Sequence, residues 1–438
     1  MAWLVIDAVA EFDLSGLYGA YRDDGHGRPA HDPAMMVALL LYCYAIGERS
    51  SRRIERRCVE DVAVRVITAN RVPDHTTVAR FRQQHGRALG ELFGEVLALC
   101  AEAGLVRVGT IAVDGTKVAA NAAVQATRSY EQIAREILAQ ADAVDAEEDE
   151  RFGEARGDEL PPEFSTAQGR RGWLREAKRR LDERRAQEAR PIPRSRPERL
   201  KEAKRRLEEE HRVEHDANAA YEAYRARGVM KDGRRFGRPP DPFQPPEAPT
   251  GKINLSDLDS RNVKTSRGWV QGYNAQVVTT EDQIVIAAEV TVDSPDFGHL
   301  EPMVRAAREE LARAGIHHVP EVVLADAGYW HQVQMEHLVS DGMTVLVPPD
   351  AKKRGGARPG WDGGHYAFMR RVLATDHGGA LYAKRQVMVE PVFADTKFNR
   401  RIDRFLRRGR AAVRSEWRMT NAAHNLLKLW RHSLAIAA

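Results

Sequence analysis

The stretch "VVLADAGYW", residues 322–330, places four apolar residues before an aspartate, a glycine and two aromatic residues. A short apolar run of this kind is typical of a buried strand, so the pattern predicts a strand over 322–325 that ends at Asp326. A carboxylate at the end of a buried strand lies at the rim of the core, where it can bind a metal ion. The alternative is that Asp326 only caps the turn that begins at Gly328.

A second strand that ends in an aspartate is predicted earlier in the chain. In "VRVGTIAVDGTKVAA", residues 106–120, alternate positions are apolar, which is typical of a strand with one buried face. Asp114 falls near the end of this strand, directly before Gly115. The chain therefore has two acidic residues at predicted strand ends.

The remaining pattern of the C-terminal half predicts a mixed α/β fold. Residues 268–293 show two alternating apolar runs joined at "TTEDQ", residues 299–315 have the spacing of an amphipathic helix, and "MTVLVPP" at 343–349 predicts a further strand. Strands that alternate with helices in this order form a mixed sheet with helices packed against it. The chain closes with predicted helices.

Residues 1–105 have the pattern of an all-helical, basic domain. Asp32 and Pro33 are a typical helix start, and short helices follow, one of which is crowded with arginines between residues 49 and 57. Short helices with a polar and basic last member are typical of helix-turn-helix DNA readers, and Arg53, Arg80 and Arg82 are the candidate DNA contacts. The alternative is a solvated, arginine-rich face of a helical bundle.

Residues 122–250 interrupt the predicted sheet domain, which spans 106–438. "REAKRRL" at 175–181 is nearly repeated as "KEAKRRL" at 201–207, with apolar residues three and four apart in each copy. This spacing predicts two charged helices that pack as a coiled-coil-like hairpin. A proline-rich stretch follows as a linker, so we interpret the whole segment as an insertion.

Composition favours a protein of two or three domains that is soluble and cytoplasmic. The chain has 438 residues, of which 43% are hydrophobic and 30% charged, and a net charge of +4. The longest apolar stretch, 35–47, is too short to cross a bilayer, so no membrane partner is expected. The three cysteines form no Cys-x-x-Cys pair, which argues against a zinc site or a disulfide framework.

A third acid completes a candidate metal site. Glu390 lies in "YAKRQVMVEPVFADTK", and together with Asp114 and Asp326 it could supply oxygen ligands for a pair of Mg2+ ions, with Mn2+ as a substitute. Two such ions can activate a water or a hydroxyl group and stabilise the leaving oxygen of a phosphodiester.

These motifs resemble those of the DDE transposases of bacterial insertion sequences, whose catalytic domain has a ribonuclease H-like fold. The likeness rests on "AVDGTKVAANA", "GWVQGYNAQ" and "ADAGYW", and on a signature of Tyr382, Arg385, Glu390 and Lys397. The resemblance implies that Asp114, Asp326 and Glu390 are the catalytic, metal-binding acids. It also implies that Arg385 and Lys397, with Tyr382 beside them, position DNA phosphates. Trp330 either stacks on an unpaired base at the element's end or is a core aromatic.

The function that the resemblance implies is Mg2+-dependent cleavage and strand transfer at terminal inverted repeats, by a homo-oligomer assembled on nucleoid DNA. One alternative is an inactive or domesticated descendant that binds DNA without cutting it. A second is a coiled-coil scaffold protein, which the predicted insertion alone favours.

Overall fold

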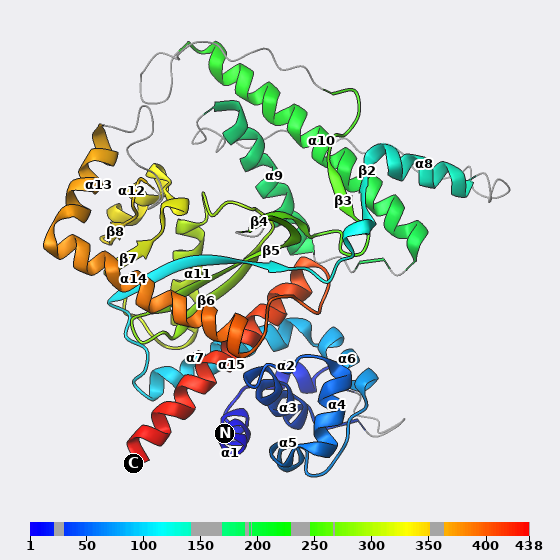
Figure 1. Ribbon diagram of the computed structural model, residues 1–438, viewed down its shortest axis with the longest axis vertical. Coiled ribbons are helices and arrows are strands. Elements are labelled where there is room, and N and C mark those ends of the chain that lie inside the picture. The colour runs from blue at the N-terminus through cyan, green and yellow to red at the C-terminus, as the bar shows by residue number, and fades with distance from the viewer. Residues whose placement is uncertain are drawn as a thin grey trace. The chain divides into compact units, whose positions relative to one another are not determined.

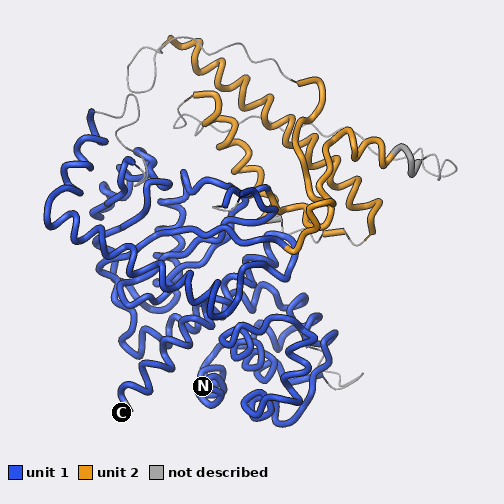
Figure 2. The backbone as a smooth tube through the Cα atoms, in the orientation of Figure 1, with its two compact units in different colours: residues 1–120, 262–438 blue, residues 121–261 orange. Residues whose placement is uncertain are grey.

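The chain folds into two compact units in the computed structural model, which describes residues 1–21, 30–141, 169–188, 192–193, 195–228, 246–265, 268–350 and 363–437. Unit 1 contains residues 1–120 and 262–438, and unit 2 contains residues 121–261 (Figure 2). Parts of the predicted insertion lie outside the described residues, namely 142–168, 189–191, 194 and 229–245.

The sheet of unit 1 is built around β1, Thr110–Ala119, and mixes parallel and antiparallel strands as the sequence predicted. The other strands are β4 Arg261–Thr265, β5 Gly268–Thr280, β6 Val285–Thr291, β7 Val322–Ala325 and β8 Thr344–Leu346. Their order is β4-β5-β1-β7-β8, and β6 also pairs with β5. The strand β1 is antiparallel to β5 and parallel to β7, while β7 is parallel to β8.

Helices cover this sheet (Figure 1). They are α11 Leu300–Arg313, α12 Gln332–Ser340, α13 Gly364–Ala374, α14 Asp376–Ala394 and α15 Arg410–Ala437; a short 3-10 turn, η3 Ala327–Tyr329, follows β7, and a π-helical turn, η4 Asp395–Asn399, follows α14. The last helix is fixed to the sheet by polar contacts: Trp417 Nε1 donates to the Gln276 carbonyl, and Asn425 bonds both backbone groups of Val285. These buried bonds hold α15 against β5 and β6.

The N-terminal region is helical, as predicted. It comprises α1 Ala2–Ala10, α2 Ser15–Tyr18, α3 Pro33–Ala45, α4 Ser51–Glu60, α5 Val62–Ile67, α6 His75–Gln84 and α7 Gly86–Glu102. Side-chain caps define two starts, because Asp32 accepts a bond from Ala34 N at α3 and Asp74 accepts bonds from Thr76 N and Thr77 N at α6. None of the described helices is long and apolar enough to cross a membrane.

The N-terminal helices belong to the same compact unit as the sheet, although the sequence predicted a separate domain that ends at residue 105. The helix α15 joins the two parts. Its Arg418 donates to the Gly90 carbonyl of α7 and pairs with Glu310 of α11, and its Glu416 pairs with Arg49 just before α4. The Glu416 carboxylate also accepts bonds from the backbone N–H groups of Leu406 and Arg407, so its charge is fully enclosed.

Unit 2 consists of β2 Thr127–Ser129, α8 Tyr130–Ala141, α9 Gly169–Glu188, α10 Arg196–Ala226 and β3 Lys252–Asn254, with a 3-10 turn, η1 Val124–Ala126, before β2. The helices α9 and α10 pack together, but the two sequence repeats do not face each other. Trp173 and Ala177 of α9 pack against Ala217 and Tyr221 of α10. The repeat in α10 packs instead on α8 and on the chain around β3, through Leu200, Ala203, Leu207, Ile133, Ile253, Leu255 and Leu258.

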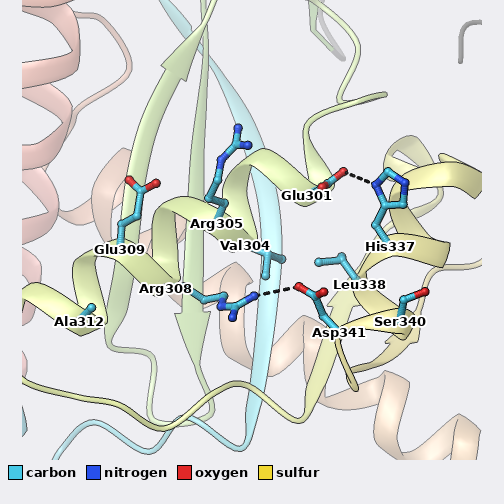
Figure 3. A pocket seen from close by; sticks show the side chains of 10 residues that line it. All are labelled: Glu301, Val304, Arg305, Arg308, Glu309, Ala312, His337, Leu338, Ser340 and Asp341. Atoms are coloured by element: carbon cyan, nitrogen blue, oxygen red, sulfur yellow. Dashed lines mark hydrogen bonds and ion pairs between the residues drawn. The ribbon is translucent and has the colours of Figure 1, made fainter. Parts of the chain in front are cut away.

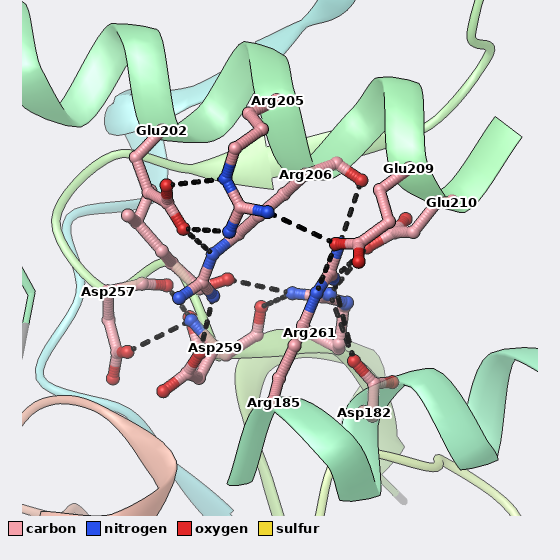
Figure 4. A network of polar contacts seen from close by, with 12 residues as sticks. Asp182, Arg185, Glu202, Arg205, Arg206, Glu209, Glu210, Asp257, Asp259 and Arg261 are labelled. Atoms are coloured by element: carbon pink, nitrogen blue, oxygen red, sulfur yellow. Dashed lines mark hydrogen bonds and ion pairs between the residues drawn. The ribbon is translucent and has the colours of Figure 1, made fainter. Parts of the chain in front are cut away.

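A network of charges accompanies these two apolar clusters (Figure 4). Arg185 of α9 pairs with Glu209 and Glu210 of α10, and Arg206 pairs with Glu202 and with Asp259. Arg185 and Arg206 have side chains that are only 7% and 6% exposed, so their charges need these partners. The hairpin is therefore held by buried ion pairs as much as by its apolar residues.

We expect Glu416→Gln to lower the free energy of unfolding by about 3 kcal/mol, because it leaves the buried Arg49 guanidinium without its charged partner. Urea unfolding followed by circular dichroism measures the loss. The control is Glu91→Gln, which removes an exposed helical ion pair with Arg87 and should cost less than about 0.5 kcal/mol. Equal effects of the two substitutions would contradict the structural role of Glu416.

We also expect unit 1 to fold without unit 2. Ala120 and Asn262 flank β5 on opposite sides, since β1 and β4 are its neighbours, and they are therefore about 10 Å apart. About six glycine and serine residues in place of 121–261 span this distance. The shortened protein should keep its strand signal in circular dichroism and unfold cooperatively. Replacing only 170–250 should instead expose Ile133 and Leu255 and cause aggregation.

Candidate functional site

Asp114 and Asp326 lie side by side at the edge of two parallel strands. Val113 of β1 pairs with Ala325 of β7, and each of these residues directly precedes one of the two acids. Parallel strands place equivalent residues at the same height, so the register that aligns the two strands also brings their carboxylates together. Asp326 directly follows β7, as predicted, but Asp114 lies in the middle of β1 and not near its end, because β1 continues to Ala119 in its pairing with β5. The two acids that the sequence singled out still share one location, where the parallel pairing stops.

Asp326 also caps a turn. Its Oδ1 accepts a hydrogen bond of 2.8 Å from Gly328 N, at the start of η3. The capping alternative is thus realised in the structure, but it uses only one of the two carboxylate oxygens. Capping and a role in the site are compatible.

The electrostatics show that the two acids crowd each other. Burial, followed by the neighbouring Asp326 carboxylate, raises the pKa of Asp114 to about 7, and the Arg385 guanidinium opposes that rise. Burial, followed by the Asp296 carboxylate, raises the pKa of Asp326. The site therefore gathers more negative charge than its own cations balance, which is typical of a functional centre.

Arg385 contacts the first acid directly. Its Nη1 donates to Asp114 Oδ2 over 2.8 Å, and both side chains are mostly buried. Tyr382 lies one turn earlier on α14, and burial raises its pKa. In the structure Arg385 thus partly neutralises the acid pair, whereas the resemblance assigned it to DNA phosphates.

Glu390 does not join the two aspartates. It is exposed on α14 and accepts a 3.0 Å hydrogen bond from Gln386 of the same helix. It lies five positions after Arg385, with four residues between them, so the two side chains leave the helix in widely different directions. Among the described residues, no group of three acidic, histidine or cysteine side chains is arranged to hold a metal ion.

Lys397 follows Glu390 by seven positions and Trp330 follows Asp326 by four, but both side chains contact other residues of the protein. Lys397 Nζ donates to the Lys117 carbonyl of β1, and burial lowers its pKa. Trp330 is 5% exposed and stacks on Tyr366 at a centroid distance of 4.9 Å. This packing agrees with the core-aromatic alternative for Trp330.

The three candidate DNA contacts of the N-terminal helices differ in exposure. Arg53 on α4 has a side chain that is 75% exposed, and Arg80 on α6 is exposed as well. Arg82 instead donates to the Arg49 carbonyl and to Ser51 Oγ, which ties α6 to the start of α4. Only Arg53 and Arg80 are therefore open to a large ligand.

Sequence reasoning missed a further acid. Asp296, in the loop between β6 and α11, contacts Lys117 of β1 and the amides of Asn274 and Gln276 of β5. The available signal was the pair of amide side chains in "YNAQVV", because polar residues inside a buried strand require a partner.

A cleft of about 590 Å³ lies elsewhere, on the surface of α11 and α12 (Figure 3). Its walls carry two ion pairs, Glu301 with His337 and Arg308 with Asp341. None of the residues that the sequence proposed for the site lines this cleft.

Two family models match the chain. The model described as Transposase domain (DUF772) matches residues 3–84, and the model described as Transposase DDE domain matches residues 250–426. Searches among curated proteins and among solved structures found no match. Asp114 lies outside both matched ranges, so its place in the site rests on the sheet geometry.

The two matches cover more than half of the chain and agree with its structure. The first contains nearly all of α1 and the whole of α2 to α6, and the second contains Asp326, Arg385 and Glu390. The chain belongs to the DDE transposases of insertion sequences.

Proposed function

We propose that this transposase cleaves and joins DNA at the terminal inverted repeats of its element, with divalent metal ions bound at Asp114 and Asp326. The observation that carries the proposal is the juxtaposition of these two carboxylates directly after the last residue pair of the parallel β1–β7 ladder, Val113 with Ala325. Their separation in the sequence is large, and the sheet alone brings them together. Hard cations bind such oxygen ligands, and Mg2+ is the ion we expect.

The strand order of the mixed sheet supports the proposal, because it fits the ribonuclease H-like arrangement that the resemblance implies. The order β6-β5-β1-β7-β8 places three antiparallel strands first and then two strands parallel to β1. In this arrangement the first acid lies on the central strand and the second follows the adjacent parallel strand, as Asp114 and Asp326 do.

The residues present fit a divalent cation. Burial raises the pKa of both Asp114 and Asp326, the Asp326 carboxylate adds to the rise at Asp114, and the Asp296 carboxylate adds to the rise at Asp326. A bound cation would relieve this repulsion. When bound, the metal ions would activate a water or a 3'-hydroxyl and stabilise the leaving oxygen of the phosphodiester. Mn2+ should substitute for Mg2+, since both ions accept carboxylate ligands in six-coordinate geometry.

The surrounding side chains would then position the DNA. Arg385 holds Asp114 Oδ2 in place through its ion pair. Once a cation binds Asp114, the planar guanidinium group can bind a DNA phosphate instead. Lys397 stands next to β1, where its ammonium group would lie near the strand being cut. Tyr382 packs beside Arg385 and orients it.

Glu390 would be the third acid. It lies on the same helix as Arg385, which already reaches Asp114, so the helix is close enough to supply a further ligand. Its exposed position requires that α14 turn or shift when DNA and metal bind. The exposed position also favours the rival function, a descendant that binds DNA without cutting it, and the substitutions below separate the two.

End recognition is proposed for α4 and α6. Arg80 lies on the exposed face of α6 with Thr76 and Gln83, spaced so that all three could reach base edges in a major groove. Arg53 on α4 would contact a phosphate. Because the two ends of an element must be held together for strand transfer, we propose that the protein acts as a homo-oligomer on DNA.

We expect Asp114→Asn, Asp326→Asn and Glu390→Gln each to reduce cleavage of a labelled inverted-repeat end by on the order of 1000-fold, while DNA binding and folding survive. The amide keeps the shape of the side chain but removes the charge that binds the cation. Gel analysis of cleavage with Mg2+, beside a binding assay, measures both properties.

Asp376→Asn is the matched control, because Asp376 is an exposed acid in the first turn of α14. Its activity should stay within a few-fold of the unchanged protein. Cleavage that is absent from the unchanged protein as well, with binding retained, would favour the non-cutting descendant. Near-normal cleavage by Asp326→Asn would contradict the metal-binding role of Asp326 and leave only its role as a turn cap.

For end recognition, we expect Arg80→Ala to lower the preference for inverted-repeat DNA over random duplex by about 1–3 kcal/mol. Arg53→Ala should weaken binding to both DNAs alike. It should also reduce the slope of log affinity against log salt concentration by about one, because one phosphate contact is lost. Arg82→Ala should mainly lower stability, because Arg82 bonds the Arg49 carbonyl. Fluorescence anisotropy at several salt concentrations tests these expectations, and an unchanged preference in Arg80→Ala would contradict the role of α6.

A further inference from the structure

Asp296 is held in a fixed orientation by three donors on one of its two oxygens. Its Oδ1 accepts hydrogen bonds from Lys117 Nζ at 2.9 Å, from Asn274 Nδ2 at 2.8 Å and from Gln276 Nε2 at 3.1 Å. Three hydrogen bonds to one oxygen fix the orientation of the whole carboxylate. The second oxygen therefore points in a defined direction.

The second oxygen turns toward Asp326. A Cβ placed on Gly328 would lie 2.9 Å from Asp326 Oδ1 and 3.5 Å from Asp296 Oδ2, so both carboxylates close on the same point. A Cβ on Gly115 would lie 2.7 Å from Asp296 Oδ1. The two glycines therefore leave space at a place where any side chain would displace the acids.

Three buried polar atoms around this space lack hydrogen-bond partners among the described residues. They are Tyr329 Oη, Asn274 Oδ1 and Gln276 Oε1, on residues that are 0%, 0% and 1% exposed. Asn274 Oδ1 lies 2.9 Å from the same Gly115 Cβ position that Asp296 Oδ1 approaches. Burying such atoms without a partner is costly, so a cation or a bound water in this space would stabilise them.

The chemistry of these atoms points to a cation. Carboxylate and amide oxygens are acceptors and are the ligands that hard divalent cations prefer, and the phenol oxygen of Tyr329 can bond a water on such an ion. Burial raises the pKa of Tyr329, and the charges of Asp296, Asp114 and Asp326 add to that rise.

We propose that Asp296 is a further acid of the metal centre, which shares a divalent cation with Asp326 through Oδ2. The inference rests on the proposed function, since it assumes a cation at Asp114 and Asp326. Lys117 opposes cation binding, because its ammonium group already neutralises Asp296 and competes with the cation. Asp296 therefore offers a further carboxylate that does not depend on α14, although Asp114, Asp326 and Asp296 are not arranged as a three-carboxylate metal site among the described residues and would have to adjust around the cation.

The rival explanation is that Asp296 only anchors Lys117. The two explanations predict opposite effects of Lys117→Met on the affinity for the cation. If Asp296 is an anchor, Lys117→Met and Asp296→Asn break the same contact and have the same effect. If Asp296 is a ligand, Asp296→Asn weakens cation binding, whereas Lys117→Met preserves or strengthens it because a competing positive charge is gone.

The test is Mn2+ binding to the full-length protein, measured by the electron paramagnetic resonance signal of free Mn2+. We expect Asp296→Asn and Asp114→Asn each to weaken binding about tenfold or more, and Lys117→Met to bind as well as or better than the unchanged protein. Asp341→Asn, which removes an exposed partner of Arg308, is the control and should bind normally. Thermal unfolding checks that each variant is folded.

Unchanged Mn2+ binding in Asp296→Asn, with binding lost in Asp114→Asn, would overturn the inference and leave the proposed function standing. Equal losses in Asp296→Asn and Lys117→Met would also overturn it, in favour of the anchor. An unchanged protein that binds no Mn2+ would overturn both. If Asp296→Asn does not fold, Gly115→Ala takes its place, because the added methyl group displaces the Asp296 carboxylate. Normal Mn2+ binding by Gly115→Ala would equally contradict the inference.

Discussion

The parallel pairing of β1 with β7 is the constraint on which the site depends. Ala112 aligns with Leu324 and Val113 with Ala325, and this register alone places Asp114 next to Asp326. A slip of one residue would turn each side chain of a strand to the opposite face and separate the two acids. Ile111, Ala112, Val113, Val323, Leu324 and Ala325 are all buried, so both strands are held inside the core. Core packing thus fixes the geometry of the candidate centre.

Collecting carboxylates in a partly buried place is unfavourable, and the structure offsets that cost with cations from two directions. Arg385 approaches Asp114 from α14, and Lys117 approaches Asp296 from within β1. These two positive charges face three carboxylates, so one negative charge stays uncompensated until a further cation binds. Burial is the main cause of the raised pKa of Asp114, and the neighbouring negative charge adds to it.

The C-terminal helix α15 links this centre to the helices proposed to read DNA. It bonds Gln276 and Val285 of the sheet on one side, and Gly90 and the turn before α4 on the other. A buried helix that contacts both parts restricts how far they can move apart. We infer that the candidate DNA-reading helices and the acids keep a fixed spacing, which would set the distance between the recognised sequence and the cut.

Periodicity in the sequence was enough to predict the strands before Asp114 and Asp326, the N-terminal helices and the mixed sheet, because alternation and helical spacing are local properties. The family signature in the sequence also led to Arg385 and Glu390. The sequence could not show that the N-terminal helices share a compact unit with the sheet, since that depends on α15, more than 300 residues away from them. It also did not reveal Asp296, whose partners come from β1 and β5. Nor did it show that Arg82 is tied to α4 and that Glu390 faces away from the acids. These features depend on which side chains meet across elements, and only the packed tertiary structure decides that.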